Sequence, residues 1–254
     1  MDEYKLGFLI PVYNHGSTLM EVVTSLIPFD CPVIVVDDGN NKENALLINK
    51  VIETYKDNKV YLVTLKKNCG KGKASNEGVK KAYRLGLTHI FQLDADGQHD
   101  VSFCNSFIEK SKKNPDAVIN GYPIYDETVP LARKNGREFS NNWCRVVTIN
   151  PYIKDVLCGF RIYPVSSYLK AIRFPAIINK RMGYDVDILA HLSWMGVRII
   201  DMGVKVTYPK DGISNFHVVK DNIRISLTFA RLCIGMFFRF PYLLIQNYKR
   251  NKDE

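Results

Sequence analysis

The stretch Ile90-Phe91-Gln92-Leu93-Asp94-Ala95-Asp96-Gly97-Gln98-His99-Asp100 decides how the chain folds. Its first residues are apolar, as in a buried strand, and Gly97 marks the turn that ends the strand. Asp94 and Asp96 are two residues apart, so both carboxylates lie on one side of an extended backbone. Because open α/β sheets bind ligands at the carboxyl ends of their strands, the pair indicates a ligand site. Its oxygen atoms suit Mg²⁺ or Mn²⁺, although a polar loop with acidic caps would have the same spacing.

Length and composition bound the class of protein. The chain has 254 residues, 46% of them hydrophobic, which is enough for one sizeable α/β domain, with or without a small extension. Its six cysteines show no zinc or disulfide spacing, so we expect reduced thiols. The acidic start Met1-Asp2-Glu3 is unlike a secretory signal and favours a cytoplasmic protein. We find no window of about 18 uncharged apolar residues and predict no transmembrane helix.

The net charge of +9 is concentrated near the C-terminus. Residues 205–254 hold nine Lys or Arg residues against four Asp or Glu residues. Such an excess is typical of proteins that bind nucleic acid, anionic lipid or phosphorylated substrates. The chain has no zinc-finger, RNP-like or clear helix-turn-helix pattern, so we expect no nucleic-acid partner.

Alternating strands and helices organise the first half of the chain. Apolar and β-branched runs predict strands at residues 4–12, 32–36, 59–63 and 88–93. The segments between them have helical patterns, with Ser17 or Thr18 as a possible cap of the first helix, and this alternation indicates a parallel, Rossmann-like sheet. Polar residues follow three of the strands, at 11–14, 37–39 and 94–98. The carboxyl ends of parallel strands share one edge, so we expect these polar residues to lie together.

A glycine-rich turn, Asn68-Cys69-Gly70-Lys71-Gly72-Lys73-Ala74, opens one of these helices. It lacks the spacing of a Walker A loop and of GxGxxG, which argues against an ATPase and a dinucleotide-dependent dehydrogenase. Its backbone N–H groups, with Lys71 or Lys73, are suited to a diphosphate. A solvated turn with lysines for solubility is an equal alternative.

Four motifs, in this order and spacing, resemble those of family-2 glycosyltransferases. They are Ile10-Pro11-Val12-Tyr13-Asn14, Val35-Val36-Asp37-Asp38-Gly39, Asn68-Cys69-Gly70-Lys71-Gly72 and Asp94-Ala95-Asp96-Gly97-Gln98-His99. The nearest branch is that of the polyprenyl-phosphate (dolichol-phosphate) mannose synthases, and the resemblance covers roughly residues 5–210. It implies a GT-A fold at residues 1–216, with a nucleotide-binding half at about 1–100 and an acceptor half at about 101–216.

The resemblance also implies roles for individual residues. The nucleoside is held by Asp38 and the backbone around Pro11, Tyr13 and Asn14. The donor-binding set implied in this way is Pro11, Tyr13, Asn14, Asp38, Lys71, Asp94 and Asp96. The metal set is Asp96, Gln98 and His217, with Mg²⁺ or Mn²⁺ bridging the nucleotide diphosphate. His217 belongs to a turn at residues 211–217 that in related enzymes closes on the donor, and a structural role for it is the commoner one.

The acceptor side is expected in the second half of the chain. After a fifth strand at 116–121, a helix from about 131 to 149 carries Arg133 and Arg137. By the resemblance this helix lies over the acceptor site, and either arginine would bind an acceptor phosphate; a basic solvated helix face is the alternative. The segment 155–163 resembles the family's GFR-x-Y strand, in which Gly159 lets the backbone come close and Arg161 is a structural ion-pair partner.

Two acids open the next helix, in Gly183-Tyr184-Asp185-Val186-Asp187. Acids favour helix N-termini for electrostatic reasons alone. The segment also resembles the site of the catalytic acid in inverting family-2 enzymes, with Asp185 as the base and Asp187 as support, although Tyr184 replaces the first acid of the usual pair. A sugar hydroxyl acceptor needs a base, whereas a phosphate acceptor is already an anion.

The last segments are two predicted strands, at 197–201 and 204–208, and a basic amphipathic helical tail at 217–254 that Pro241 breaks or kinks. Interleaved aromatic and basic residues favour an interfacial helix on anionic lipid, with a packed helix or a dimer contact as alternatives. We therefore expect a peripheral protein on the inner face of the cytoplasmic membrane.

Together these features predict a metal-dependent inverting glycosyltransferase that uses a UDP- or GDP-sugar. The acceptor is left open between a polyprenyl phosphate, another lipid and a cell-envelope glycan. The alternatives are a nucleotidyltransferase, which would need a glycine-rich loop where Pro11-Val12-Tyr13-Asn14 stands, and a non-catalytic membrane-associated binding module.

Overall fold

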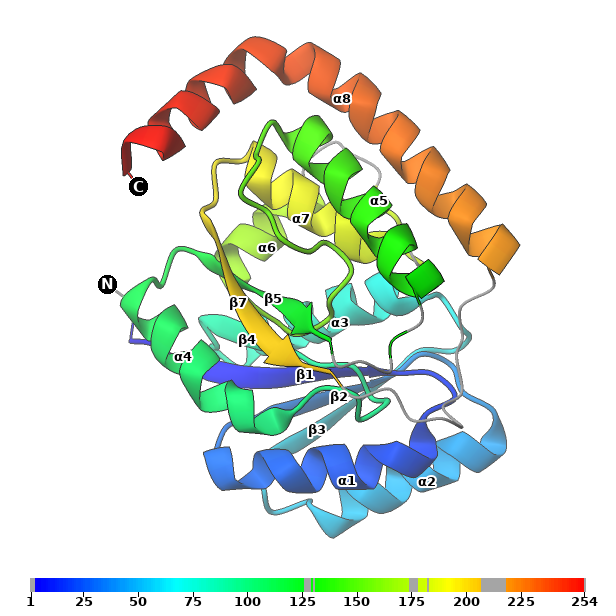
Figure 1. Cartoon of the computed structure of the whole chain (residues 1–254). Coiled ribbons are helices and arrows are strands. Elements are labelled where there is room, and N and C mark those ends of the chain that lie inside the picture. Colours follow the sequence, from blue (N-terminus) through cyan, green and yellow to red (C-terminus); the bar gives the residue numbers. More distant parts are fainter. Residues whose placement is uncertain are drawn as a thin grey trace.

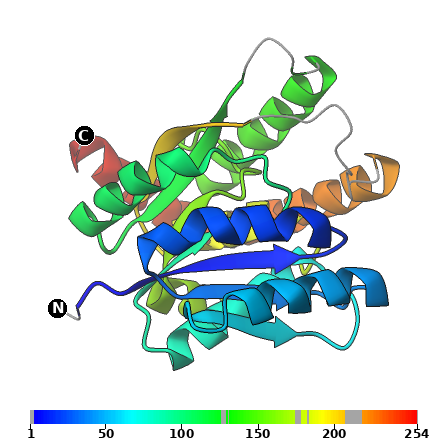
Figure 2. The same ribbon diagram turned by 90° about the horizontal axis from the view of Figure 1, so that it is seen from below.

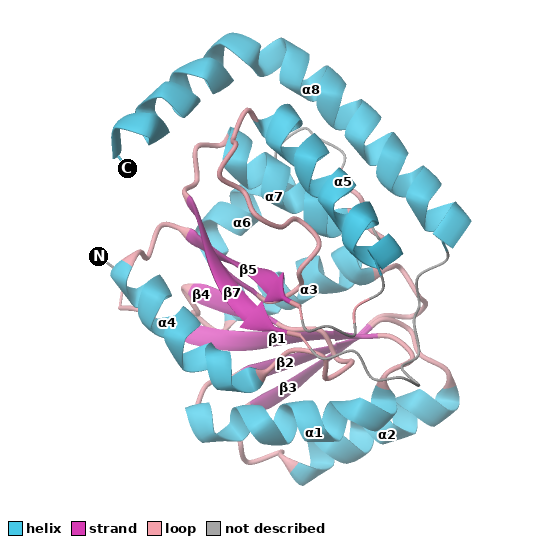
Figure 3. Ribbon diagram, viewed as in Figure 1, coloured by secondary structure: helices cyan, strands magenta, loops and turns pink. Residues whose placement is uncertain are grey.

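A seven-stranded sheet in the order β3-β2-β1-β4-β6-β5-β7 forms the centre of the molecule (Figures 1 and 3). The computed structural model describes residues 3–125, 129, 131–173, 178–181, 183–206 and 218–253. The strands are β1 Leu6–Val12, β2 Val33–Asp37, β3 Val60–Thr64, β4 His89–Gln92, β5 Val118–Ile124, β6 Arg161–Pro164 and β7 Ile199–Lys205. Within this sheet β6 runs antiparallel to both of its neighbours, while the other pairs are parallel.

Helices cover both faces of the sheet (Figure 2). The α-helices are α1 Gly16–Leu26, α2 Lys42–Thr54, α3 Lys71–Arg84, α4 Cys104–Lys113, α5 Leu131–Thr148, α6 Val165–Arg173, α7 Tyr184–Trp194 and α8 Val218–Asp253. Successive residues of β1 face opposite sides, so Phe8 packs with α1, α2 and α4 while Leu9 packs with α3, α6 and α7. The sheet is thus buried on both faces, as its continuous apolar strands predict.

The carboxyl ends of β1, β2 and β4 meet at one edge of the sheet, because the three strands are parallel neighbours. The predicted meeting of the polar residues that follow them is therefore confirmed. Strand β6 returns between β4 and β5 and places Arg161 opposite Gln92 on one side and Asn120 on the other. It brings the segment before it to the end of β4, where Asp94 lies.

Three details differ from the sequence prediction. One strand, β7, replaces the two predicted at 197–201 and 204–208, since a parallel ladder with β5 continues from Ile199 to Lys205. The helix α6 was not predicted. The first helix has His15 as its N-cap and no side-chain cap, so neither Ser17 nor Thr18 caps it; instead the Thr18 hydroxyl donates to the carbonyl of Ala95.

The helix α8 continues through Pro241 and arches over α5 and α7 (Figure 1). Its inner face is buried against them, at Ile225, Phe229, Leu232 and Leu243. Within the described residues, its Ile223–Arg250 portion is long and apolar enough to cross a membrane by length and composition, with a mean hydropathy of 1.4. The sequence analysis predicted no transmembrane helix. It required about 18 apolar residues without any charged residue, whereas this helix carries charged residues among its apolar ones.

A buried ion pair joins α8 to α7. Asp187 is fully buried and accepts hydrogen bonds from Arg231 of α8 and from the backbone of Asn179, with His191 Nδ1 at 3.4 Å. Replacing Arg231 by Met should destabilise the fold by about 3 kcal/mol, because the carboxylate would stay buried without its cation. Thermal unfolding measures this, with the exposed Arg84→Met as the control, expected to change stability by less than about 0.5 kcal/mol. Equal stability of both variants would show that the ion pair between Arg231 and Asp187 does not stabilise the fold.

Candidate active site

Three elements bring a lysine between two carboxylates at the sheet edge. Lys71 opens α3, Asp94 follows β4 and Asp185 lies in the first turn of α7. Lys71 Nζ is 2.7 Å from Asp94 Oδ1 and 3.0 Å from Asp185 Oδ2. The structure therefore brings together three of the residues that sequence analysis assigned to donor binding and catalysis.

The charges of this group depend on one another. Burial alone would lower the pKa of Lys71, but the carboxylates of Asp185 and Asp94 outweigh it and raise that pKa. Burial alone would raise the pKa of Asp94, but the Lys71 ammonium, with a smaller effect of His99, lowers it. The second Asp185 oxygen, Oδ1, is buried without a hydrogen-bond partner among the described residues. This oxygen could therefore accept a hydrogen bond from a bound ligand.

The carboxylate of Asp96 lies beside this group, and its pKa is shifted in the opposite direction to that of Asp94. Burial, followed by the charge of Asp94, raises the pKa of Asp96. Its Oδ1 accepts a hydrogen bond from the backbone N–H of Gln98 at 3.1 Å, across the turn at Gly97. Two neighbouring carboxylates in a partly buried site favour a cation, since a divalent ion would remove the penalty on the second charge. Across the described ranges, however, no cluster of three His, Cys, Asp or Glu side chains could hold a metal ion by itself.

Gly159 fixes the other side of Asp94. A Cβ atom built on Gly159 would lie 2.4 Å from Asp94 Oδ2, which is closer than such atoms can approach. The predicted close approach of the backbone at Gly159 is thus present, and the neighbour is the carboxylate itself. The site has room for Asp94 only because residue 159 has no side chain.

The glycine-rich turn is held by Asp38. This buried carboxylate accepts hydrogen bonds from the backbone N–H groups of Cys69 and Gly70, both at 2.8 Å, while burial raises its pKa. Two residues further on, the N–H group of Gly72 donates to the carbonyl of Lys180 at 2.9 Å. In the observed conformation the N–H groups of Cys69, Gly70 and Gly72 are thus already paired within the protein, and the Lys71 side chain reaches the two carboxylates. The predicted contact of the turn with a diphosphate stays a prediction.

The remaining donor-side residues lie at the end of β1. Pro11 pairs with Val36 in the sheet, Tyr13 is exposed, and Asn14 has a positive φ of 61°. The side chain of Asn40 joins this end to β2, since it accepts from Asn14 N at 2.8 Å and donates to the carbonyl of Val12 at 2.9 Å. Sequence analysis missed Asn40, although its position directly after the Asp37-Asp38-Gly39 motif is a usable signal.

His99 was also missed as a site residue. Its Nε2 lies 3.7 Å from the thiol of Cys158, and its ring is tilted against Phe160. Burial lowers the pKa of His99, although the charges of Asp94 and Asp96 oppose this effect. His99 therefore closes the inner wall of the site behind the two aspartates.

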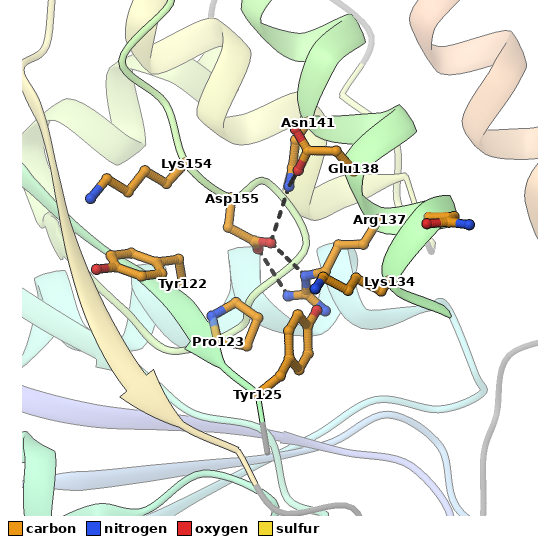
Figure 4. Close-up of a pocket in the computed structure, with 10 residues that line it drawn as sticks. Tyr122, Pro123, Tyr125, Lys134, Arg137, Glu138, Asn141, Lys154 and Asp155 are labelled. Carbon is orange, nitrogen blue, oxygen red and sulfur yellow. Dashed lines mark hydrogen bonds and ion pairs between the residues drawn. The ribbon is translucent and has the colours of Figure 1, made fainter. Parts of the chain in front are cut away.

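In the half of the chain predicted to bind the acceptor, Arg137 and Asp155 form a bidentate ion pair beside a cavity of about 360 Å³ (Figure 4). Arg137 Nε and Nη2 lie 2.5 Å and 2.9 Å from the two Asp155 oxygens. Asp155 also accepts from the backbone N–H of Cys158 at 2.7 Å, so it links this cavity to the wall behind Asp94. Two further cations, Lys134 and Lys154, line the cavity together with Tyr122 and Tyr125.

Four residues that the sequence analysis singled out either do not have the predicted contacts or lie outside the residues that the structure describes. Asp187 faces α8 instead of the site, because residues two apart on a helix lie on different faces. Arg161 makes no ion pair among the described residues; its Nη1 donates to the backbone carbonyl of Asp185 at 2.9 Å. The predicted ion pair is therefore wrong, while a structural role is present. His217 and the side chain of Arg133 lie outside the described residues.

Comparisons with known proteins identify the family of the chain. The model of glycosyl transferase family 2 matches residues 8–177. The dolichyl-phosphate β-glucosyltransferase of Dictyostelium discoideum is 24% identical over 96% of this chain and 76% of its own length. The polyprenol monophosphomannose synthase of Mycolicibacterium smegmatis is 23% identical over 81% of this chain and 78% of its own. Glucosyl-3-phosphoglycerate synthase from Mycobacterium tuberculosis, solved with Mn²⁺, UDP and phosphoglyceric acid, superposes with a TM-score of 0.65 at 12% identity, over 91% of this chain and 78% of that one.

The sheet order, the reversed β6 and the carboxylates at the end of β4 define a GT-A fold, as predicted. Such a fold with this acidic edge is typical of enzymes that use nucleotide sugars. The chain belongs to glycosyltransferase family 2. It is a glycosyltransferase, and the predicted similarity to the polyprenyl-phosphate branch is confirmed by the two relatives above.

The contact between Gly159 and Asp94 gives a test of the site. Gly159→Ala should lower kcat/KM by about 10- to 100-fold, because the new methyl group displaces Asp94 from Lys71. The control is Gly136→Ala on α5, where a Cβ would meet nothing within 4 Å; it should leave activity unchanged. Steady-state transfer rates of the two folded variants measure the difference, and equal rates would mean that Asp94 needs no fixed position.

Proposed function

We propose that the enzyme transfers a sugar from a UDP- or GDP-sugar to a polyprenyl phosphate, or to another lipid-linked acceptor, with inversion at the anomeric carbon. The observation that carries the proposal is the partly buried pair Asp94 and Asp96 at the end of β4, with the Lys71 ammonium in contact with Asp94. The printed names of the dolichyl-phosphate and polyprenol relatives support the acceptor class. The structural neighbour with Mn²⁺ and UDP supports the donor class.

Mg²⁺ or Mn²⁺ fits the residues present, because Asp96 offers carboxylate oxygens in a site where a second negative charge is disfavoured. Asp96 and Gln98 would hold it, with the donor diphosphate completing the ligand set. The ion would supply Lewis-acid stabilisation of the leaving diphosphate. His217 is a further proposed ligand from the segment outside the described residues.

The chain's own groups have distinct parts in this proposal. Lys71 is placed to bind a donor phosphate oxygen and to balance Asp94. The nucleoside would lie over Pro11, Tyr13 and Asn14 at the exposed end of β1, next to the turn that Asp38 holds. Arg137 orders the acceptor cavity through Asp155, and Lys134 and Lys154 are the cations there that would meet an acceptor phosphate.

A lipid-linked acceptor keeps its phosphate at the headgroup level of a membrane. The active site must therefore come close to the bilayer, and we place the enzyme peripherally on the inner face of the cytoplasmic membrane through the tail at 217–254.

The metal proposal is tested at Asp96. Asp96→Ala should reduce transfer by about 1,000-fold or more, since the leaving diphosphate loses its charge stabilisation. Mn²⁺ with a UDP- or GDP-sugar should raise the melting temperature of the parent enzyme and not of this variant. Glu109→Ala, an exposed carboxylate of α4, is the control. Full activity of Asp96→Ala would remove the mechanism, and a stronger shift with a CMP-sugar would replace the proposed donor.

The acceptor proposal is tested at Asp185. A phosphate acceptor is already ionised, so Asp185→Asn should lower kcat less than about tenfold when the acceptor is a polyprenyl phosphate. A hydroxyl acceptor would lose about 100- to 10,000-fold without its base. The pH dependence of the transfer rate separates the two cases. Only with a hydroxyl acceptor should the Asp185→Asn variant lose the part of the pH profile that reports the ionisation of a catalytic base. A large loss with the phosphate acceptor would contradict the proposal.

A further inference from the structure

The helix α8 has a second apolar stripe that the fold does not use. On its outer side, residues recur at alternating spacings of four and three; they are Ile223, Leu227, Ala230, Ile234, Phe237, Pro241, Leu244 and Tyr248. We call them the outer stripe. Its large side chains are 46% to 73% exposed, and the neighbouring Phe238 is 76% exposed. Exposed apolar surface of this extent marks an interaction site.

The helix α5 extends this surface. Phe139, Trp143 and Val146 share one face of α5 and are all exposed. The Trp143 ring lies 6.5 Å from that of Phe229 on α8. The two helices lie side by side (Figure 1). The opposite face of α5 lines the acceptor cavity with Lys134, Arg137 and Asn141. The cavity is therefore separated from the exposed surface by one helix, a thickness of about 10 Å.

The charge of α8 selects the kind of partner. Between Asp221 and Asp253 the sequence has no acidic residue and six basic ones, at 224, 231, 239, 249, 250 and 252. Three of these, Arg231, Arg239 and Arg250, contact Asp187, the Trp194 ring and Ser193 of the domain. Two copies of α8 packed through the outer stripe would bring these like charges together, with no carboxylate between Asp221 and Asp253 on either helix to balance them. An anionic surface, in contrast, is complementary to both the charge and the aromatic side chains.

We propose that the outer stripe of α8 and the aromatic face of α5 lie flat on an anionic lipid bilayer. The proposal deepens the proposed function and rests on it only for the identity of the acceptor. Polar contacts along the inner side tie α8 to the domain, since Arg231 pairs with Asp187 and the side chains of Gln246 and Arg250 donate to the carbonyls of Trp194 and Ser193. A helix bound in this way lies in the interface and does not span the membrane.

Vesicle flotation of the full chain tests the surface. The parent protein should float with phosphatidylcholine vesicles that contain about one third phosphatidylglycerol, and much less with phosphatidylcholine alone. Phe237→Glu combined with Phe238→Glu should lower the bound fraction about tenfold or more, and Phe139→Glu should lower it by a smaller factor. The matched control is Leu46→Glu, because Leu46 is 70% exposed on the distant helix α2 and should not change binding.

The outcomes separate this surface from the proposed function. Loss of flotation with unchanged melting temperature, and with unchanged donor-induced stabilisation by Mn²⁺ and a UDP- or GDP-sugar, supports the surface. Unchanged flotation of the Phe237/Phe238 variant overturns it, as does binding that resists alkaline carbonate, which would indicate a spanning helix. A dimer that this variant dissociates, with no vesicle binding by the parent, would assign the stripe to a second copy of the chain. A protein that floats as expected but transfers no sugar would overturn only the proposed function.

Discussion

The Lys71 ammonium lies between carboxylates that come from two different parts of the chain. Asp94 ends the central strand β4, and Asp185 begins α7, ninety residues later. Partly buried charges of one sign need a counter-charge close by, so neither carboxylate could keep its place without the lysine. The contact therefore fixes the start of α3 and α7 against the end of β4. A donor diphosphate that drew Lys71 toward itself would change the surroundings of both aspartates at once, which couples donor binding to the acceptor side.

The reversed strand β6 explains how the second half of the chain reaches this group. Because it runs antiparallel to β4, this strand begins at the carboxyl edge, with Arg161 opposite Gln92. The segment just before it supplies Gly159 against Asp94 and Asp155 against Arg137. The backbone of Asp155 also receives a hydrogen bond from Asn120 of β5. One short segment thus sets both the position of the donor-side carboxylate and the wall of the acceptor cavity. Movement of Asp155 would be transmitted to Gly159, and the reverse, through the three residues between them, 156–158.

The sequence was a reliable guide where a local pattern determines the structure. Apolar runs placed the first five strands, and the polar residues after β1, β2 and β4 predicted their common edge. Contacts between distant segments could not be predicted in this way. Nothing near Asp38 signals that its carboxylate holds the turn at residues 69–70, or that the carbonyl of Lys180 accepts from the N–H group of Gly72. Asp187 was predicted to support Asp185 because the two are close in sequence, yet the helical period turns it toward Arg231. The pairing of β5 with all of β7 likewise overrode the apparent break near Gly203.

The sequence of α8 contains more apolar residues than packing on the domain requires. The buried stripe at Ile225, Phe229, Leu232 and Leu243 already attaches the helix to α5 and α7. The outer stripe adds no contact to this core, and exposed phenylalanines favour aggregation of a protein that stays in water. The basic residues between Asp221 and Asp253, with no acidic residue among them, add self-repulsion. Both features are costs in solution, and both become favourable on an anionic bilayer. The helix is therefore best understood as an element with two partners, the catalytic domain on its inner side and a lipid surface on its outer side.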